Sequence, residues 1–162
     1  MRSAVYPGSF DPFTLGHLDI LERATGIFDK VIVAVLENPN KSPLFSVEER
    51  LGMIRDSIDD NGKIEVDSFD GLTVEYARKV SAGSIVRGLR ATSDFENEFQ
   101  MALFNRRLAP EITTVFLMTS FANVFLSSSL IKEVARHGGA VDFAVPPSVA
   151  RRLAQLTENR GQ

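Results

Sequence analysis

The clearest candidate for chemistry in this sequence is a histidine at the start of a predicted helix. Residues 7–17 read PGSFDPFTLGH, in which two glycines and two prolines restrict the backbone ahead of His17. Unpaired backbone N–H groups and the helix dipole attract anions to such a helix start, and an imidazole there can donate to a phosphate oxygen. The alternative is a capped helix start with a half-exposed histidine. Because the chain has only 2 histidines and this one follows a predicted strand, we favour a functional role.

Basic side chains also occur where other predicted strands end. Lys41 lies in the loop after the second strand, within NPNKSPLF, and Arg87 and Arg90 lie at and beyond the end of the fourth, SIVRGLR. The planar guanidinium suits phosphate, and arginine is seldom buried unless it is paired. Lys41 could equally be a solvated loop residue. Arg87 could instead form a salt bridge with one of three acids that follow it: Asp94, Glu96 or Glu98.

Three consecutive serines, Ser127, Ser128 and Ser129, stand at the start of another predicted helix. Any one of them could be its N-cap, and three in a row favour a cluster of hydroxyl and amide groups around an anion. Lys132 lies one turn further, on the same side as Ser128 or Ser129. Together with His17 and the basic residues, these groups occupy four different loops that follow strands. Their convergence indicates a phosphate site more strongly than any single group does.

The fold that could bring these loops together follows from an alternation of short β-rich runs with amphipathic helical segments. We predict strands over 3–6, 30–36, 63–69, 84–87 and 113–119. We predict helices over 15–28, 46–57, 72–81, 93–108, 128–137 and 147–156, followed by a frayed tail at 157–162. Capping boxes at Ser46–Glu49 and Ser93–Glu96 mark two of the helix starts.

This order predicts an α/β fold: one Rossmann-like domain over residues 1–162, with a five-stranded parallel sheet and helices on both faces. Ligands of open α/β sheets bind beyond the carboxyl ends of the strands. The loops expected to form a site are therefore 7–14, 37–45, 69–72, 88–92 and 120–127.

Composition excludes several other classes of protein. The 18 Lys and Arg against 21 Asp and Glu give a net charge of −3, which argues against a nucleic-acid partner but leaves small anions open. The chain has no cysteine, so thiolate catalysis and thiolate metal sites are impossible. The longest apolar run, 31–36, is far short of the ~20 residues that a membrane helix needs. With no apolar signal segment before Pro7, we expect a cytoplasmic protein without membrane contact. The P-loop and GxGxxG phosphate motifs are also missing.

The motif TLGH at 14–17 and the serine triplet at 127–129 resemble the signatures of the nucleotidyltransferase α/β superfamily. The likeness extends in order to YPGSFDPFTLGH, NPNKSPLF, EER, IVRGLR, SDFENEFQMALFNR and FLSSSLIKEVARHGG. With these segments the chain resembles the phosphopantetheine adenylyltransferase family over most of its length.

The resemblance implies transfer of AMP from ATP to 4′-phosphopantetheine, giving dephospho-coenzyme A and pyrophosphate, by direct in-line attack without a covalent intermediate. It also implies Mg²⁺ dependence and a cytoplasmic homohexamer. By matching position, ATP would be held by Ser9, Phe10, His17, Gly88, Leu89, Arg90, Glu98, Asn123, Val124, Phe125, Leu126, Ser127, Ser128 and Ser129. The pantetheine side would be lined by Ser9, Lys41, Thr73, Arg87, Met101 and Asn105. Four residues would be catalytic: His17, Lys41, Arg87 and Arg90.

Some positions depart from the family pattern. Asn97 and Asn123 stand where members often carry aromatic residues, whereas Ser9 in place of the commoner threonine keeps the hydroxyl. Two other functions stay open at this stage. One is a related nucleotidyltransferase with another phosphate acceptor, such as nicotinamide mononucleotide, and the other is an ATP-binding module without catalysis.

Overall fold

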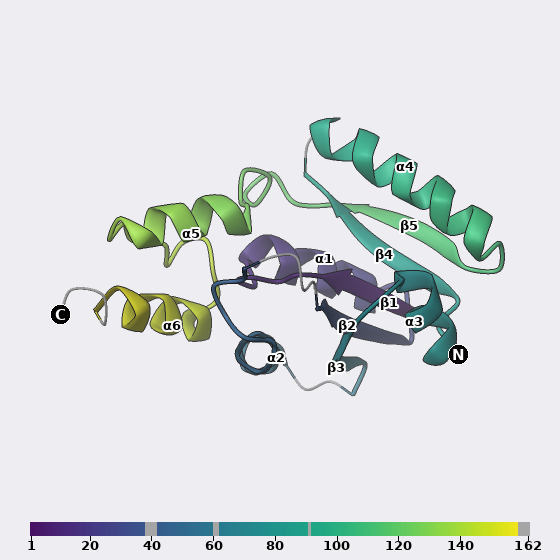
Figure 1. The fold of residues 1–162 in the computed structure, drawn as a ribbon, viewed down its shortest axis with the longest axis horizontal. Coiled ribbons are helices and arrows are strands. Elements are labelled where there is room, and N and C mark those ends of the chain that lie inside the picture. The colour runs from purple at the N-terminus through teal and green to yellow at the C-terminus, as the bar shows by residue number, and fades with distance from the viewer. Residues whose placement is uncertain (38–41, 60–61, 91, 159–162) are drawn as a thin grey trace.

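The computed structural model describes residues 1–37, 42–59, 62–90 and 92–158. Its centre is one parallel sheet with strand order β3-β2-β1-β4-β5 (Figure 1). The strands are β1 (Ser3–Gly8), β2 (Lys30–Leu36), β3 (Ile64–Phe69), β4 (Ser84–Leu89) and β5 (Thr113–Met118). The chain builds outward from β1 in one direction and then, from β4 onward, in the other. The switch point of the sheet therefore lies between β1 and β4, where ligands of such folds bind.

Two strands are longer than their sequences predict. The dipeptide Pro7-Gly8 was expected to end the first strand, but β1 continues through it because Pro7 pairs with Ala34 and Gly8 with Val35 of β2. On the other side of the switch point, β4 continues to Leu89 because its pairing with β5 extends that far.

Six helices connect and cover the sheet in the described part of the chain: α1 (Leu15–Thr25), α2 (Val47–Arg55), α3 (Thr73–Lys79), α4 (Thr92–Leu108), α5 (Ser128–Arg136) and α6 (Pro147–Glu158). α1 ends three residues before its predicted end, because the backbone N–H of Gly26 turns back to the carbonyls of Arg23 and Ala24. α6 runs on to Glu158, so part of the predicted tail is helical, while 159–162 lie outside the described residues. No helix in these described ranges is long and apolar enough to cross a membrane.

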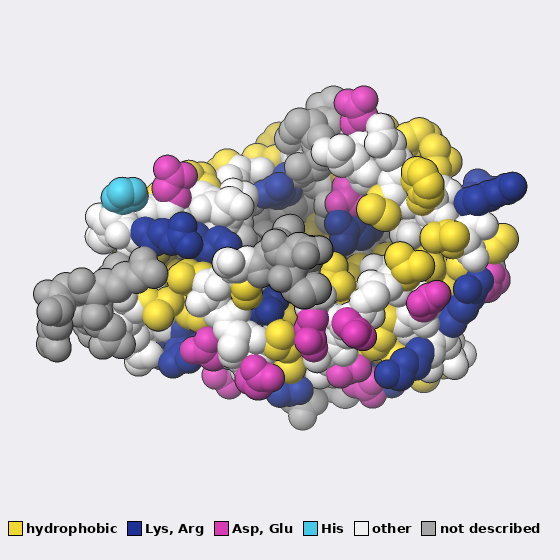
Figure 2. Space-filling model, in the orientation of Figure 1, with side chains coloured by type: hydrophobic (Ala, Val, Ile, Leu, Met, Phe, Trp, Pro, Cys, Tyr) yellow, Lys and Arg dark blue, Asp and Glu magenta, His cyan; other side chains and the backbone are white. Residues whose placement is uncertain are grey.

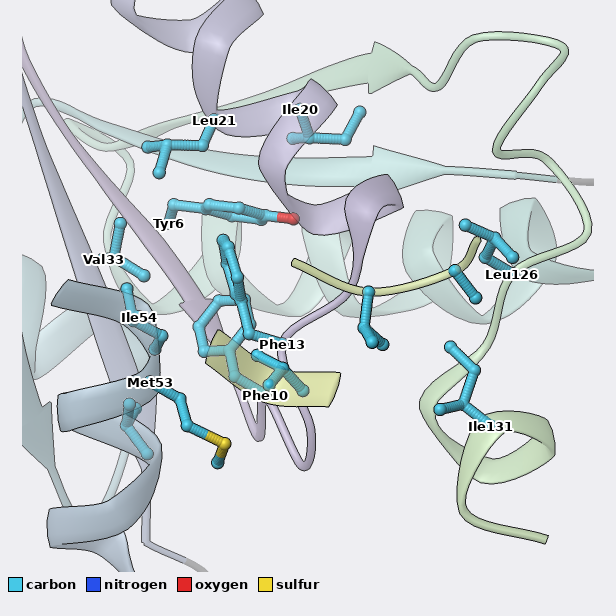
Figure 3. Packing of buried hydrophobic residues seen from close by; sticks show 14 of the residues in the cluster. Tyr6, Phe10, Phe13, Ile20, Leu21, Val33, Met53, Ile54, Leu126 and Ile131 are labelled. Atoms are coloured by element: carbon cyan, nitrogen blue, oxygen red, sulfur yellow. The ribbon is translucent and has the colours of Figure 1, made fainter. Parts of the chain in front are cut away.

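Alternate residues of the central strands point to opposite faces of the sheet, as the two-residue period of a strand requires. Val31, Val33 and Val35 of β2 pack in the larger buried cluster, together with residues of α1, α2, α5 and α6. Ile32 and Ala34 pack in a second cluster with residues of α3. Helices therefore cover both faces, which confirms the predicted fold class. Figure 3 shows the part of the larger cluster in which Phe10 and Phe13 lie beside Met53 and Ile54 of α2, with Ile131 of α5 farther away in the same cluster.

Candidate active site

A cavity of about 630 Å³ opens at the switch point of the sheet. β1 and β4 pair only through Ala4 with Ser84 and Val5 with Ile85, after which the two strands separate. Their carboxyl ends and the following loops then form the opposite walls of the cavity. Figure 2 shows the surface hollowed at this place, with basic side chains beside the hollow.

The cavity brings together most of the residues expected to bind phosphates. Eleven of the predicted site residues line it: Ser9, Phe10, His17, Arg87, Gly88, Arg90, Glu98, Leu126, Ser127, Ser128 and Ser129. They come from the loop after β1, the first turn of α1, the end of β4 and its following residue, helix α4 and the start of α5. The convergence expected from the sequence is therefore present for the described residues.

The remaining predicted residues have other positions. Leu89, Asn123, Val124 and Phe125 are absent from the residues that line the cavity, and so are Thr73, Met101 and Asn105. Thr73 begins α3, while Met101 is exposed and Asn105 is buried on α4. Their proposed contacts with substrates stay predictions. Lys41 lies outside the described residues.

His17 belongs to a reciprocal cap at the start of α1. The hydroxyl of Thr14, the N-cap residue, accepts from the backbone N–H of His17 at 3.2 Å. In return, the backbone N–H of Thr14 donates to Nδ1 of the imidazole at 3.1 Å. Glu or Gln commonly makes this return bond in a capping box, and here a histidine makes it. Because Nδ1 acts as an acceptor, the proton of the neutral ring resides on Nε2.

The surroundings of the imidazole keep it uncharged. Its ring packs against those of Phe10 and Phe13, with centroid distances of 5.0 and 5.6 Å. Burial lowers the pKa of His17 to about 4, with further contributions from the positive charges of Arg90 and Arg87. At neutral pH the side chain is therefore a neutral hydrogen-bond donor of fixed tautomer in a cavity lined with cations.

The loop between β1 and α1 contains a strained residue. Phe10 has φ of 47°, in the left-handed region that side chains other than glycine rarely adopt, and it is buried. Its ring lies over Gly8, where an added Cβ would be 2.9 Å from Cζ of Phe10. Glycine is therefore required at position 8 for this close approach. Strain of this kind persists only where the surrounding contacts enforce it, as they do here beside His17.

Arg87 forms a salt bridge with Glu98, which is the alternative that the sequence left open for this residue. Its Nε donates to Glu98 Oε2 at 2.7 Å, its Nη2 to Oε1 at 2.5 Å, and its Nη1 to the carbonyl of Pro7 at 3.1 Å. Burial opposes the charge of Arg87, but the hydrogen bonds and charge of Glu98 outweigh burial and raise its pKa. A guanidinium has five N–H groups, so this pairing still leaves donors for a ligand in the cavity.

The start of α5 closes the cavity from another side. Ser127 is the N-cap, because its Oγ accepts from the N–H of Leu130 at 3.2 Å, whereas Ser128 Oγ donates to the carbonyl of Pro12 at 2.8 Å. Arg90 also fixes this segment, since its Nη1 donates to the carbonyl of Leu126 at 2.8 Å.

Two further charged residues line the cavity that sequence reasoning did not select, Asp11 and Arg50. The buried carboxylate of Asp11 accepts from the ammonium of Lys132 at 2.8 Å and from the backbone N–H groups of Leu44 and Phe45. Arg50 donates to the carbonyl of Ser9. The helical spacing of Lys132 from the serines indicated that it faces the site, but no local pattern indicates its partner.

The side chains of the site do not form a metal centre by themselves. Within the described ranges no three His, Asp or Glu side chains lie close enough together to hold a metal ion. The two carboxylates of the cavity, Asp11 and Glu98, are each paired with a cation. Mg²⁺ bound here would need oxygen ligands that a substrate supplies.

Comparisons with known proteins identify the family of the chain. The cytidylyltransferase-like family matches residues 5–134. A phosphopantetheine adenylyltransferase of Caldanaerobacter subterraneus is 56% identical over 155 residues, 96% of this chain and 97% of its own. Another of Synechococcus elongatus is 60% identical over 151 residues, 93% of this chain and 91% of its own.

A solved structure shows the same fold at low identity. It is a bifunctional NMN adenylyltransferase/ADP ribose pyrophosphatase from Francisella tularensis, with a TM-score of 0.75 and 17% identity. The match covers 97% of this chain and 50% of that one, and it concerns the fold alone. The sequence identity to the phosphopantetheine adenylyltransferases is much higher, 56% and 60%, and it extends over nearly the whole length of both proteins. This chain therefore belongs to the phosphopantetheine adenylyltransferase family.

Proposed function

We propose that the chain transfers AMP from ATP to 4′-phosphopantetheine, giving dephospho-coenzyme A and pyrophosphate. The observation that carries this proposal is the family membership, because relatives named for this activity are 54–60% identical over nearly the full chain. The switch-point cavity supports it, since it places a neutral imidazole among guanidinium and hydroxyl groups.

The reaction needs no covalent nucleophile on the protein. An oxygen of the acceptor's phosphate forms a bond to the α-phosphorus of ATP, and the bond from that phosphorus to the bridging oxygen of pyrophosphate breaks. Catalysis of such a step consists of positioning both substrates and stabilising charge on the phosphoryl oxygens. We assign the stabilising hydrogen bond to Nε2–H of His17, which the cap with Thr14 leaves free to donate to an α-phosphate oxygen.

The cations would hold the phosphates on either side of the reacting phosphorus. Arg87 would bind the phosphate of the acceptor, together with Lys41, and Arg90 with the serine-rich start of α5 would bind the β- and γ-phosphates. Arg87 and Arg90 come from β4 and its following loop, and the serines from the start of α5, so both groups of donors reach one cavity from different elements.

We propose that Mg²⁺ enters with the nucleotide, as the metal complex of ATP. Mg²⁺ keeps several waters and is commonly bound through substrate phosphates with few protein ligands. The pairing of Asp11 and Glu98 with cations fits this arrangement. The metal would neutralise charge on the triphosphate while the chain supplies the donors described above.

We also propose that the protein assembles as a homohexamer in the cytoplasm. Support for an assembly comes from α4 and from β5, an edge strand with its following loop, where several large apolar side chains are exposed. They include Phe95, Phe99, Met101, Leu103, Phe104, Leu108, Met118 and Phe121. Sedimentation velocity tests the proposal, and a monomer at micromolar concentration would contradict it.

The proposed function is tested by pyrophosphate release from ATP with a panel of acceptors. We expect release with 4′-phosphopantetheine and none with nicotinamide mononucleotide or without an acceptor. Release with nicotinamide mononucleotide instead would support the rival transferase. If no acceptor gave release while ATP still bound, the chain would be a nucleotide-binding module. The likeness to the Francisella structure does not favour the rival, because it reflects the fold only.

A further inference from the structure

Arg50 is a buried charged residue that the proposed mechanism does not use. It lies on α2, lines the cavity, and is only 4% exposed. Within the described ranges no carboxylate forms a salt bridge with it. Its Nη1 instead donates to the carbonyl of Ser9 at 2.8 Å and its Nε to the carbonyl of Ser46 at 3.2 Å. Burying a guanidinium costs free energy unless it is hydrogen-bonded, and the two carbonyls are the groups that stabilise the buried charge of Arg50.

The carbonyl that Arg50 holds belongs to the residue before the strained one. Ser9 directly precedes Phe10, whose φ is 47°. Immediately after Phe10, the carboxylate of Asp11 accepts from the N–H groups of Leu44 and Phe45 at 2.9 and 3.0 Å. The turn 9–11 is therefore hydrogen-bonded on both sides of the strained residue, to α2 before it and to the residues that precede α2 after it.

Phe10 connects this turn to the imidazole. Its ring meets that of Tyr6 edge-on at 5.3 Å and that of His17 edge-on at 5.0 Å. Figure 3 shows Phe10 beside Phe13, between Tyr6 and the side chains of α2. A change in the backbone at Ser9 would move the Phe10 ring, and the packing on His17 would change with it.

We infer that Arg50 is a positioning residue for His17: by holding the Ser9 carbonyl it fixes the Phe10 ring against which the imidazole packs. The inference rests on the proposed function for its effect on rate. Arg50 acts through Phe10 and does not itself touch substrate. It therefore affects the rate constant of the chemical step more than substrate affinity.

The test compares Arg50→Lys with Arg55→Lys. Arg55 lies on the same helix and donates to a backbone carbonyl, that of Val66 at 3.2 Å, but it is exposed and outside the cavity. A lysine at position 50 keeps the charge but lacks the rigid fork from which Nε and Nη1 of Arg50 donate to two separate carbonyls. We expect Arg50→Lys to lower kcat between about 10- and 100-fold, as small misplacements of a reacting group do, with KM for either substrate changed less than about threefold. Arg55→Lys should leave kcat and both KM values as they are.

A second measurement does not depend on activity. The chain has only 2 histidines, so the ring protons of His17 can be followed individually in an NMR titration. Burial lowers the pKa of the His17 imidazole to about 4 in the folded chain. In Arg50→Lys a less enclosed His17 ring should titrate closer to the ordinary value of about 6.5.

The outcomes separate this inference from the proposed function. If the chain had another activity, the titration of His17 would still shift in Arg50→Lys. The inference is wrong if His17 titrates as before, or if KM rises with kcat unchanged, since Arg50 would then bind a substrate directly. If Arg50→Lys does not fold, Phe10→Leu keeps Arg50 and its bonds but removes the ring. The same shift of the His17 titration is expected in that variant, and an unchanged titration would overturn the inference.

Discussion

The two walls of the cavity are held by different kinds of interaction. The imidazole wall, residues 9–17, is held by backbone hydrogen bonds and ring packing around an uncharged His17. The ion-pair wall, Arg87 with Glu98, is held by a bidentate salt bridge whose side chains are 32% and 19% exposed. The imidazole wall holds a neutral hydrogen-bond donor, so its state depends little on salt concentration or on pH near neutrality. The ion-pair wall presents the positive charge of Arg87, and a phosphate can share that charge with Glu98 or take the place of Glu98.

The largest effect is expected from the imidazole wall. His17→Ala removes the donor assigned to the α-phosphate, and we expect kcat to fall about 10²–10³-fold, as for other single donors to a developing oxyanion. Steady-state kinetics with both substrates measures it, with ATP affinity determined separately. The exposed His137→Ala is the control and should retain full activity. Near-native kcat in His17→Ala with ATP still bound would remove His17 from the mechanism.

The same wall gives stability a defined pH dependence. His17 has a pKa of about 4 in the folded chain and an ordinary value of about 6.5 when unfolded. Between these values the unfolded chain binds more protons, so the free energy of unfolding falls as the pH drops through this window, by at most ~3 kcal/mol. Urea unfolding from pH 7.5 to 4.5 should show a steeper loss in the native chain than in His17→Gln. Parallel curves would show that the imidazole is not held neutral.

Regular elements and their order along the chain were predictable because they depend on local patterns. The run KVIVAVL predicts a buried strand from its apolar, β-branched side chains, and β2 has the same bounds. The capping box of Ser46 and Glu49 is also present, because both members lie within one turn. The predicted box at Ser93 and Glu96 involves a side chain outside the described ones.

What the sequence could not predict depends on contacts between distant segments. The pairing of Arg87 with Glu98, rather than with a neighbouring acid, is decided by where α4 lies against β4. The bond from Arg50 to Ser9 joins residues 41 apart in the chain. The cap of Thr14 with His17 is local, but histidine is not the residue by which such caps are usually identified. Strand order, which creates the switch point, likewise depends on pairing between strands that lie far apart in the chain, such as β1 with β4.

The ion-pair wall should respond to geometry as well as to charge. Arg87→Lys keeps a positive charge but cannot donate twice to Glu98 and once to Pro7. We expect kcat/KM for the acceptor to fall about tenfold, the loss of roughly one well-oriented hydrogen bond to a charged group. Arg78→Lys is a matched control, because Arg78 pairs with Glu111 at 2.6 Å on the surface, and its activity should be unchanged. An unaffected Arg87→Lys would mean that charge alone suffices at this wall.

The smallest effect is expected at the seam where α1 of the imidazole wall packs on β4 of the ion-pair wall. A Cβ at Gly88 would lie 3.0 Å from Cγ1 of Ile20, so Gly88→Ala must push α1 and β4 apart by a few tenths of an ångström. We expect a loss of ~1 kcal/mol in the free energy of unfolding, measured by urea denaturation, with a matching fall in activity.

At Gly52, within α2, an added Cβ meets nothing within 4 Å. Gly52→Ala should therefore stabilise the chain by ~0.5–1 kcal/mol through helix propensity alone. Equal effects at the two glycines would mean that the seam tolerates displacement, and the two walls would then be positioned independently of each other.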